Sequence, residues 1–420
     1  MIAIPFIYFS ILLAYIIRKK RTFDISAYLV SLYLISSFFS ILVDANNLRY
    51  FDTKDYKITL IPTILYCFLL TITIWPFFRF KSEKIVSIRL YDPNVFNKIV
   101  YFFFVCFLLI SISSFGSIFK VLTGDLEELR NVLSRGESSG ELPSIGGPLK
   151  PFYLIAGIFG GYSLVMLLFY FYSICFLQRS KVFNSIILVS SMSIIVLGIL
   201  GIDRSKTTYW LISYGFMLVF FWRYMPKKQR KSIFKISLIF AGLVTAYFVA
   251  VTVSRFGEKD AGSEGGMISY AGQSFINFCF FFDKVEYKEF SLQRIFPLFY
   301  KLFINNGIES SVELNTVISL QTGKAIGVFS TFIGDIMIAS GKIAAIIYCF
   351  IFTLIASKFT KFKNSSQIYF HELLIVFCLI TVPLLGIFVH FYAGFPMMIA
   401  LLFFIFYFIH LKLKLKKNNS

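Results

Sequence analysis

Three cationic side chains stand next to apolar segments, in positions where they could bind an anion together. Arg204 and Lys206 follow the apolar segment 182–202, and Arg255 comes just after the apolar segment 233–253. A guanidinium group binds phosphate oxygens through two parallel hydrogen bonds. Two arginines at the same depth on successive outward-facing helix ends therefore predict a site for phosphate or pyrophosphate. The alternative for each is a long side chain that reaches water from a helix end.

The signatures of several common enzyme classes are absent from the sequence. It contains no Walker phosphate-binding loop, no dinucleotide-binding glycine motif, no HExxH and no GxSxG. Nucleotide hydrolysis, dinucleotide chemistry and the common hydrolase mechanisms therefore lack support. The six cysteines have no metal-binding spacing, and the acid pairs Asp125-x-Glu127 and Glu258-x-Asp260 are of a kind common in polar loops. We therefore predict neither a metal site nor a cofactor.

The elements that must position these residues are membrane helices. Hydrophobic residues make up 57% of the 420 residues and charged residues only 15%, which excludes a soluble globule. The apolar blocks are continuous and long, unlike the alternating strands of a membrane barrel. We predict an all-α polytopic membrane protein, one domain over 1–420, with eleven spans at 1–17, 25–43, 58–78, 99–119, 151–177, 182–202, 207–222, 233–253, within 327–357, 368–390 and 395–411.

The basic residues indicate the orientation of these spans. More than half of the 41 Lys and Arg residues lie in alternate connections, which the positive-inside rule places in the cytoplasm: 18–21, 79–98, 178–181, 223–235, 358–363 and 412–420. The N-terminus is then outside and the C-terminus inside. The net charge of +19 is a topology signal, and we predict no nucleic-acid partner. Two long loops, 120–150 and 254–326, face outward, and we expect the apolar stretches Met267–Phe282 and Ile295–Ile304 to form helices on the membrane surface or against the bundle.

A polar pair interrupts the late apolar block Phe329–Ala356. Gly334 and Gly341 lie within this block, and Asp335 and Lys342 are seven residues apart. That spacing places two side chains on one face of a helix. We predict a kinked or partly re-entrant segment with both polar groups turned inward. The alternative is that the membrane boundary lies near Lys342 and that water solvates both.

Local motifs and topology together resemble the O-antigen and capsular-repeat polymerases, the Wzy family of oligosaccharide repeat unit polymerases, whose architecture is related to the GT-C superfamily. The motifs are the turn Gly201–Ser205, Arg255 beyond the next span, and Phe329–Asp335 leading to Ser340-Gly341. The last is similar to the family's N-x-Y-T and D-F-G signature. Ser330 stands where the family has Tyr, and Ala339 where it has Asp. An R-x10-G spacing also occurs in both long loops, at Arg135…Gly146 and Arg255…Gly266.

The resemblance implies polymerisation of oligosaccharide repeat units into O-antigen or capsule at the outer face of the bacterial cytoplasmic (inner) membrane. Donor and acceptor would be oligosaccharides linked to undecaprenyl pyrophosphate, and a chain-length-regulating membrane protein is a further expected partner. An acceptor hydroxyl would attack the anomeric carbon of the donor as lipid pyrophosphate leaves. Positive charge must meet that leaving group. We therefore expect Arg204, Arg255 and Lys206 to bind it, with Arg135 as a further substrate-binding residue.

The same reaction needs a base for the acceptor hydroxyl. Glu309 and Glu313 precede the signature stretch and Asp335 lies within it, so we rank these three first as catalytic residues. They stand ahead of Asp203, Glu258 and Asp260. His390, at the outer end of the tenth predicted span, is a further alternative.

Three other functions fit the same sequence. An O-antigen ligase of this fold uses a histidine in the large outward loop, and Ser254–Ile326 contains none. A flippase for lipid-linked repeats has short loops throughout, which the 73-residue insert disfavours. A structural membrane protein leaves the outward arginines unexplained. Fold analogy alone does not decide among these functions.

Overall fold

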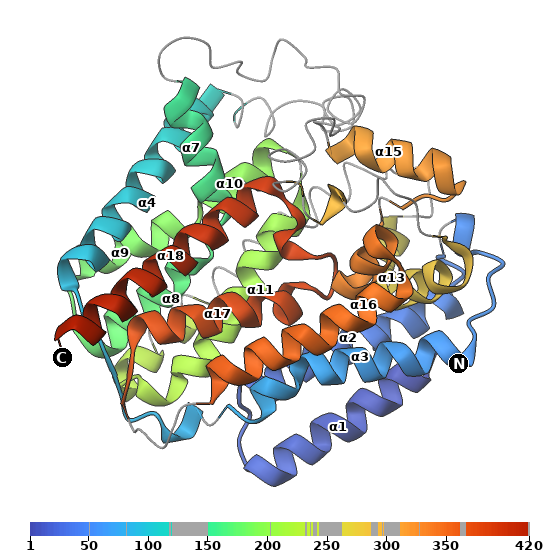
Figure 1. The fold of residues 1–420 in the computed structure, drawn as a ribbon, viewed down its shortest axis with the longest axis horizontal. Helices are drawn as coiled ribbons and strands as arrows, with labels where there is room; N and C mark the ends of the chain where they lie inside the picture. Colours follow the sequence, from blue (N-terminus) through green and yellow to red (C-terminus); the bar gives the residue numbers. More distant parts are fainter. Residues whose placement is uncertain are drawn as a thin grey trace. The chain divides into compact units, whose positions relative to one another are not determined.

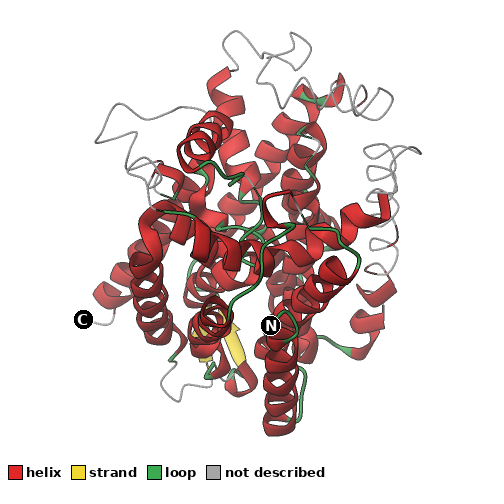
Figure 2. Ribbon diagram, turned by 90° about the vertical axis from the view of Figure 1, so that its right-hand side faces the viewer, coloured by secondary structure: helices red, strands yellow, loops and turns green. Residues whose placement is uncertain are grey.

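The structure is a computed structural model that describes residues 1–49, 51–80, 82–116, 119, 150–201, 203–231, 233–235, 237, 242, 263–286, 293–295, 297, 311–326, 328–361 and 367–418. These residues are mostly helical, and the sheet among them is one pair of three-residue strands (Figure 2). The fold is therefore all-α, as the continuous apolar blocks predict.

Six described helices are long and apolar enough to cross a membrane: Ile25–Ala45, Leu60–Lys84, Pro93–Ser113, Lys181–Leu200, Thr331–Thr360 and Pro396–Leu415. A seventh span results if Pro151–Gly161 and Val165–Leu177, which are bent by 68° at their junction, are counted together. The chain is thus a multi-pass helical membrane protein. The total of eleven spans and the orientation of the termini stay predictions, and most of the predicted span 233–253 lies outside the described residues.

The chain divides into two compact units, and the predicted single domain over 1–420 stays a prediction. Unit 1 comprises Met1–Ser82, Ala261–Asn364 and Cys378–Met398, and unit 2 comprises Glu83–Asp260, Ser365–Phe377 and Ile399–Ser420. The elements of unit 1 are α1 (Ile4–Lys20), α2 (Ile25–Ala45), η1 (Phe51–Thr53), α3 (Leu60–Phe78), α13 (Ser263–Lys284), α15 (Ser311–Thr322), α16 (Thr331–Thr360), η6 (Phe391–Ala393) and the second half of α17 (Phe370–Leu385) (Figure 1).

The core of unit 1 forms around α13, which packs against α2, α3 and α16 (Figure 1). The predicted apolar helix Met267–Phe282 is therefore part of the bundle. Gly272 allows this packing, because a Cβ there would lie 2.4 Å from the backbone of Phe39 in α2. The hydroxyl of Ser36 donates to the Ala271 carbonyl at 3.0 Å beside this crossing. Small residues let membrane helices approach closely.

The helix α16 changes character at Gly341, whose φ of 87° and ψ of 168° break the helix. Every residue from Thr331 to Ala339 is buried, whereas Ile343 beyond the break is 75% exposed. The predicted kink and the inward position of Asp335 are thereby confirmed. The prediction for Lys342 is wrong, because its side chain is exposed and its ammonium lies 4.5 Å from the ring centroid of Phe282. The break cancels the helical register that would place two residues seven apart on one face.

Unit 2 contains the two strands, the described helices from Pro93 to Tyr224 and most of the last helix. Its elements are η2 (Ser82–Lys84), β1 (Ser87–Arg89), α4 (Pro93–Ser113), α7 (Lys150–Gly161), α8 (Val165–Tyr172), the π-helix η3 (Ser173–Leu177), α9 (Lys181–Ser191), α10 (Ser193–Leu200), α11 (Arg204–Phe221), η4 (Trp222–Tyr224), β2 (Gln367–Tyr369), the first half of α17 and most of α18 (Phe395–Asn418). The strands pair in parallel, Ser87 with Gln367. Phe370, directly after β2, packs its ring 4.6 Å from Tyr172 and 4.8 Å from Phe169.

Candidate functional site: a buried Arg294–Asp335 cluster

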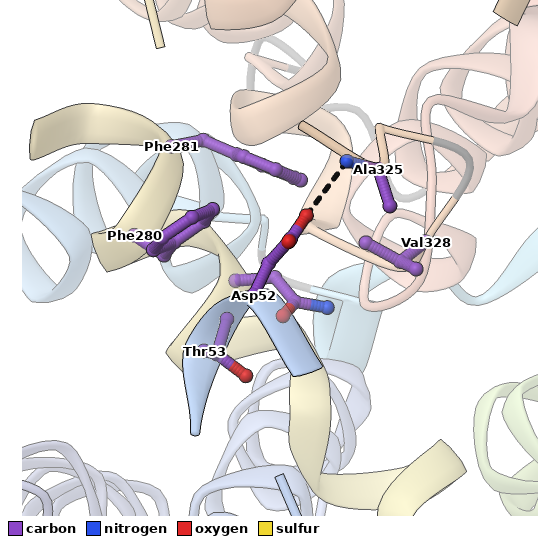
Figure 3. Close-up of a pocket in the computed structure, with 7 residues that line it drawn as sticks. Asp52, Thr53, Phe280, Phe281, Ala325 and Val328 are labelled. Carbon is purple, nitrogen blue, oxygen red and sulfur yellow. Dashed lines mark hydrogen bonds between the residues drawn. The ribbon is translucent and has the colours of Figure 1, made fainter. Parts of the chain in front are cut away.

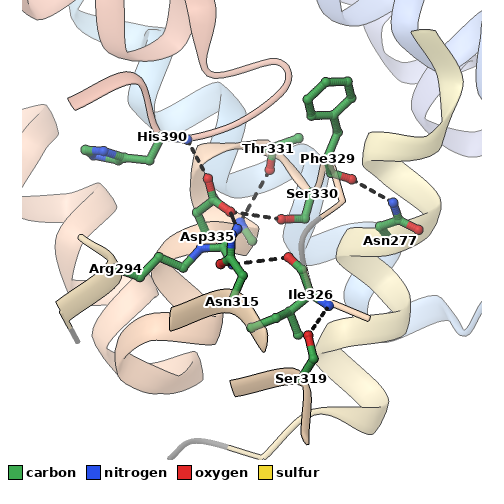
Figure 4. Close-up of polar contacts among 11 residues, drawn as sticks. Asn277, Arg294, Asn315, Ser319, Ile326, Phe329, Ser330, Thr331, Asp335 and His390 are labelled. Carbon is green, nitrogen blue, oxygen red and sulfur yellow. Dashed lines mark hydrogen bonds and ion pairs between the residues drawn. The ribbon is translucent and has the colours of Figure 1, made fainter. Parts of the chain in front are cut away.

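A buried ion pair lies near the start of α16 (Figure 4). Asp335 is 2% exposed, and its Oδ1 accepts a hydrogen bond from Nη2 of Arg294 at 2.8 Å. Its Oδ2 accepts from the backbone N–H of His390 at 2.6 Å, and Oγ of Ser330 lies 3.4 Å from Oδ1. Charges are buried in proteins at high cost unless they are paired and hydrogen-bonded. Asp335 meets both conditions.

The guanidinium group of Arg294 connects three segments of unit 1. Nη1 donates to Oδ1 of Asn315 in α15 at 2.7 Å and to the carbonyl of Ile326 at 3.1 Å, while Nη2 binds Asp335 in α16. The planar fork of arginine suits such divergent contacts better than the single ammonium of lysine. Arg294 therefore positions α15 and the segment before α16 relative to Asp335.

The backbone at the start of α16 is held by the chain that follows α17. The N–H groups of Ser330 and Thr331 donate to the carbonyl of Phe388, and the N–H of Phe332 donates to that of Gly386. Thr331 has a φ of 67°, a left-handed conformation that is costly for a β-branched residue. Such strain persists where the surrounding structure determines it, and it clusters at functional sites. Gly386 is required here, since a Cβ would lie 2.5 Å from the Phe332 ring.

His390 lies between α17 and α18, and its ring is buried in the interior. Its Nε2 is 2.9 Å from the hydroxyl of Tyr348, and its side chain points away from Asp335 (Figure 4). Within the part of the chain that the structure describes, Nδ1 is buried without a hydrogen-bond partner.

A cavity of ≈ 120 Å³ adjoins this cluster (Figure 3). Its walls come from η1, from α13 and from the segment before α16, and they consist of Asp52, Thr53, Asn277, Phe280, Phe281, Ala325 and Val328. The carboxylate of Asp52 accepts a hydrogen bond from the N–H of Ala325 at 2.8 Å. The amide nitrogen of Asn277 donates to the carbonyl of Phe329 at 2.7 Å. The cavity and the ion pair thus share the segment that leads into α16.

In unit 2, Arg204 is the first residue of α11 and is only 6% exposed. Asp203 caps this helix by accepting from the N–H of Ser205 at 2.9 Å, which gives that carboxylate a structural role. The ammonium of Lys206 lies 4.0 Å from Asp203 and 3.4 Å from the carbonyl of Leu197. The buried position of Arg204 differs from that of a long side chain that extends into water from a helix end. A helix N-terminus also favours bound anions.

The structure places the remaining predicted site residues as follows. Glu313 lies in the first turn of α15 and is exposed, whereas Asp335 lies in the buried cluster. Arg135, Arg255 and Glu309 lie outside the described residues, as do the loop 120–149 and nearly all of Ile295–Ile304.

Sequence reasoning missed Arg294. The sequence does contain a signal for it. Arg294 is a cation in the larger loop, and an apolar stretch, Ile295 to Phe299, follows it directly. Among the described residues, no three His, Cys, Asp or Glu side chains group in a way that could hold a metal ion.

The chain matches no protein-family model, no curated protein and no solved structure. The fold itself defines the class, a multi-pass membrane protein of α-helices. The described part of unit 1 contains a buried ion pair at the start of a broken helix, next to a small cavity.

Proposed function

We propose that the protein is a membrane glycosyltransferase that polymerises oligosaccharide repeat units linked to undecaprenyl pyrophosphate. The observation that carries the proposal is the buried Arg294–Asp335 pair. Asp335 ends the stretch Phe329–Asp335, one of the motifs that carry the resemblance to repeat-unit polymerases. Ionisable groups placed among apolar membrane helices are costly and usually functional.

The chemistry requires positive charge at the leaving pyrophosphate and an acceptor hydroxyl that can lose its proton. Arg204 supports the first requirement, because it combines a buried guanidinium with the N-terminus of α11. Lys206, Arg255 and Arg135 remain the further candidates for substrate binding.

Asp335 has a different role in this proposal from that of a base. Its two carboxylate oxygens already accept from Arg294 and from the His390 backbone, so an acceptor hydroxyl would have to displace one of these donors. We therefore assign Asp335 to positioning Arg294. Glu313, which is exposed, and Glu309 stay candidates for the base.

The proposal is tested by deleting the gene in its host and separating the surface glycans on a gel. A polymerase predicts loss of long chains while carriers bearing a single repeat persist, and recovery of the ladder when the gene is restored. Loss of every modified band would indicate a ligase or a flippase instead.

The reaction is then tested with the purified chain and a lipid-linked single repeat. Products of two or more repeats, formed without nucleotide sugars, support polymerisation. A repeat that crosses the bilayer of a vesicle but does not elongate would show transport and contradict the proposal.

A further inference from the structure

The cavity of unit 1 is comparable in volume to, and slightly smaller than, a protein cavity that holds one six-membered ring. Its volume is ≈ 120 Å³, and an apolar protein cavity of about 150 Å³ holds one benzene molecule. Three separate segments supply its walls, around η1, α13 and Ala325–Val328. Ligand sites are typically mostly apolar, with a few polar groups that fix orientation.

The lining selects among ligand chemistries. The ring of Phe280 already contacts the ammonium of Lys324, which lies 5.6 Å from its centroid. Phe281 is therefore the ring that can cover the face of a ligand. Among its described residues, the lining has one carboxylate, Asp52, and neither Lys nor Arg. A carboxylate repels phosphate and accepts hydrogen bonds from hydroxyl groups. It has about four lone-pair positions, of which the N–H of Ala325 uses one.

The carboxylate of Asp52 lies near Phe281 and Val328 (Figure 3). A ligand here therefore meets an apolar surface and a hydrogen-bond acceptor at once. A pyranose ring has this combination, since its faces carry C–H groups and its edges carry hydroxyls.

The cavity is coupled to the ion pair by covalent and hydrogen-bonded connections. Ala325 lines the cavity, and the carbonyl of the next residue, Ile326, accepts from Arg294. Asn277, which also lines the cavity, donates to the carbonyl of Phe329, which precedes the strained start of α16. A ligand in the cavity therefore contacts the segment that Arg294 and Asp335 position.

We infer that this cavity is a subsite for one sugar ring of the oligosaccharide substrate, with Asp52 accepting from ring hydroxyls and Phe281 covering an apolar face. The inference rests on the proposed function and adds a location for the saccharide.

The test measures binding apart from polymerisation. The full chain is purified in a detergent without sugar groups, and saturation-transfer NMR records the binding of the methyl glycosides of glucose, galactose and N-acetylglucosamine. Asp52 is exposed, and Asp52→Asn removes its negative charge while keeping the shape of its side chain. Asp55→Asn is the matched control, because Asp55 is also exposed and does not line the cavity.

At least one glycoside is expected to bind, with about tenfold weaker binding to Asp52→Asn and unchanged binding to Asp55→Asn. Equal binding to both variants, or binding of none of the glycosides, would overturn the inference. Binding of tetramethylammonium in place of the glycosides would also overturn it, by showing a cation site.

The two proposals fail separately. If the wild-type protein elongates chains and Asp52→Asn does not change glycoside binding, the subsite is rejected and the polymerase function is retained. Asp52-dependent glycoside binding without elongation of lipid-linked repeats retains the subsite and rejects the polymerase.

Discussion

Asp335 and Arg294 are 41 residues apart in sequence, and their side chains form an ion pair 2.8 Å long in the interior of unit 1. The side chains are 3% and 12% exposed, respectively. Exposed ion pairs contribute little to stability, whereas loss of one partner from a buried pair leaves an uncompensated charge. Removing either side chain therefore changes both the stability of the site and its charge.

The ion pair predicts a large loss of stability when one partner is removed. Asp335→Asn and Arg294→Met should each lower the free energy of unfolding by ~3–5 kcal/mol. The double variant should lose less than the sum of the two, because no buried charge remains. Thermal unfolding in detergent measures this. Lys414→Ala, which removes a partner from the exposed pair with Asp92, is the control and should cost ~1 kcal/mol or less. Additive losses would contradict the coupling.

Replacing Arg204 should shorten the polymer. Arg204→Ala should lower the elongation rate by ~10²–10³, because a cation is lost where the charge of the pyrophosphate develops. Arg204→Lys should recover only part of the rate, since the ammonium lacks the bidentate fork. Because Arg204 is buried, unfolding is measured alongside glycan ladders at matched expression. Arg179→Ala changes an exposed arginine and serves as the control. A wild-type ladder from a folded Arg204→Ala protein would reject the phosphate role.

Replacing Gly272 with a larger residue should weaken the packing of α13 against α2. Gly272→Ala should destabilise the protein by ~1–3 kcal/mol, because the new Cβ meets the backbone of Phe39 at 2.4 Å. Gly157→Ala is a matched control within α7, where a Cβ meets no atom of the described residues within 4 Å. That change should leave stability unchanged or raise it by up to ~1 kcal/mol, because alanine favours helices. Similar unfolding temperatures for both variants would show that the crossing tolerates separation.

The basic connections predict the sidedness of the chain. A reporter active only outside the cytoplasm should be active when fused after Gly262 and inactive after Gln229, because Lys227–Lys231 is a strong cytoplasmic retention signal. Lys227→Gln together with Lys228→Gln should weaken that retention. The reverse pattern of reporter activity would invert the predicted topology.

The sequence by itself determined the helices, because each apolar segment satisfies its own backbone hydrogen bonds within a local stretch of chain. The class of protein, most helix positions and the break near Gly341 follow from such local rules. It also identified Asp335 as a residue of interest, from the cost of a carboxylate in an apolar segment.

Only the tertiary structure decided which groups meet. Nothing local indicates that Arg294 binds Asp335 or that Asp52 and Phe281 line one cavity, since these contacts join segments far apart in the chain. Lys342 shows the same limit, because its direction depends on the backbone angles of one glycine. Helix formation depends on neighbours in sequence, whereas a binding site depends on packing between helices, which hydropathy does not encode.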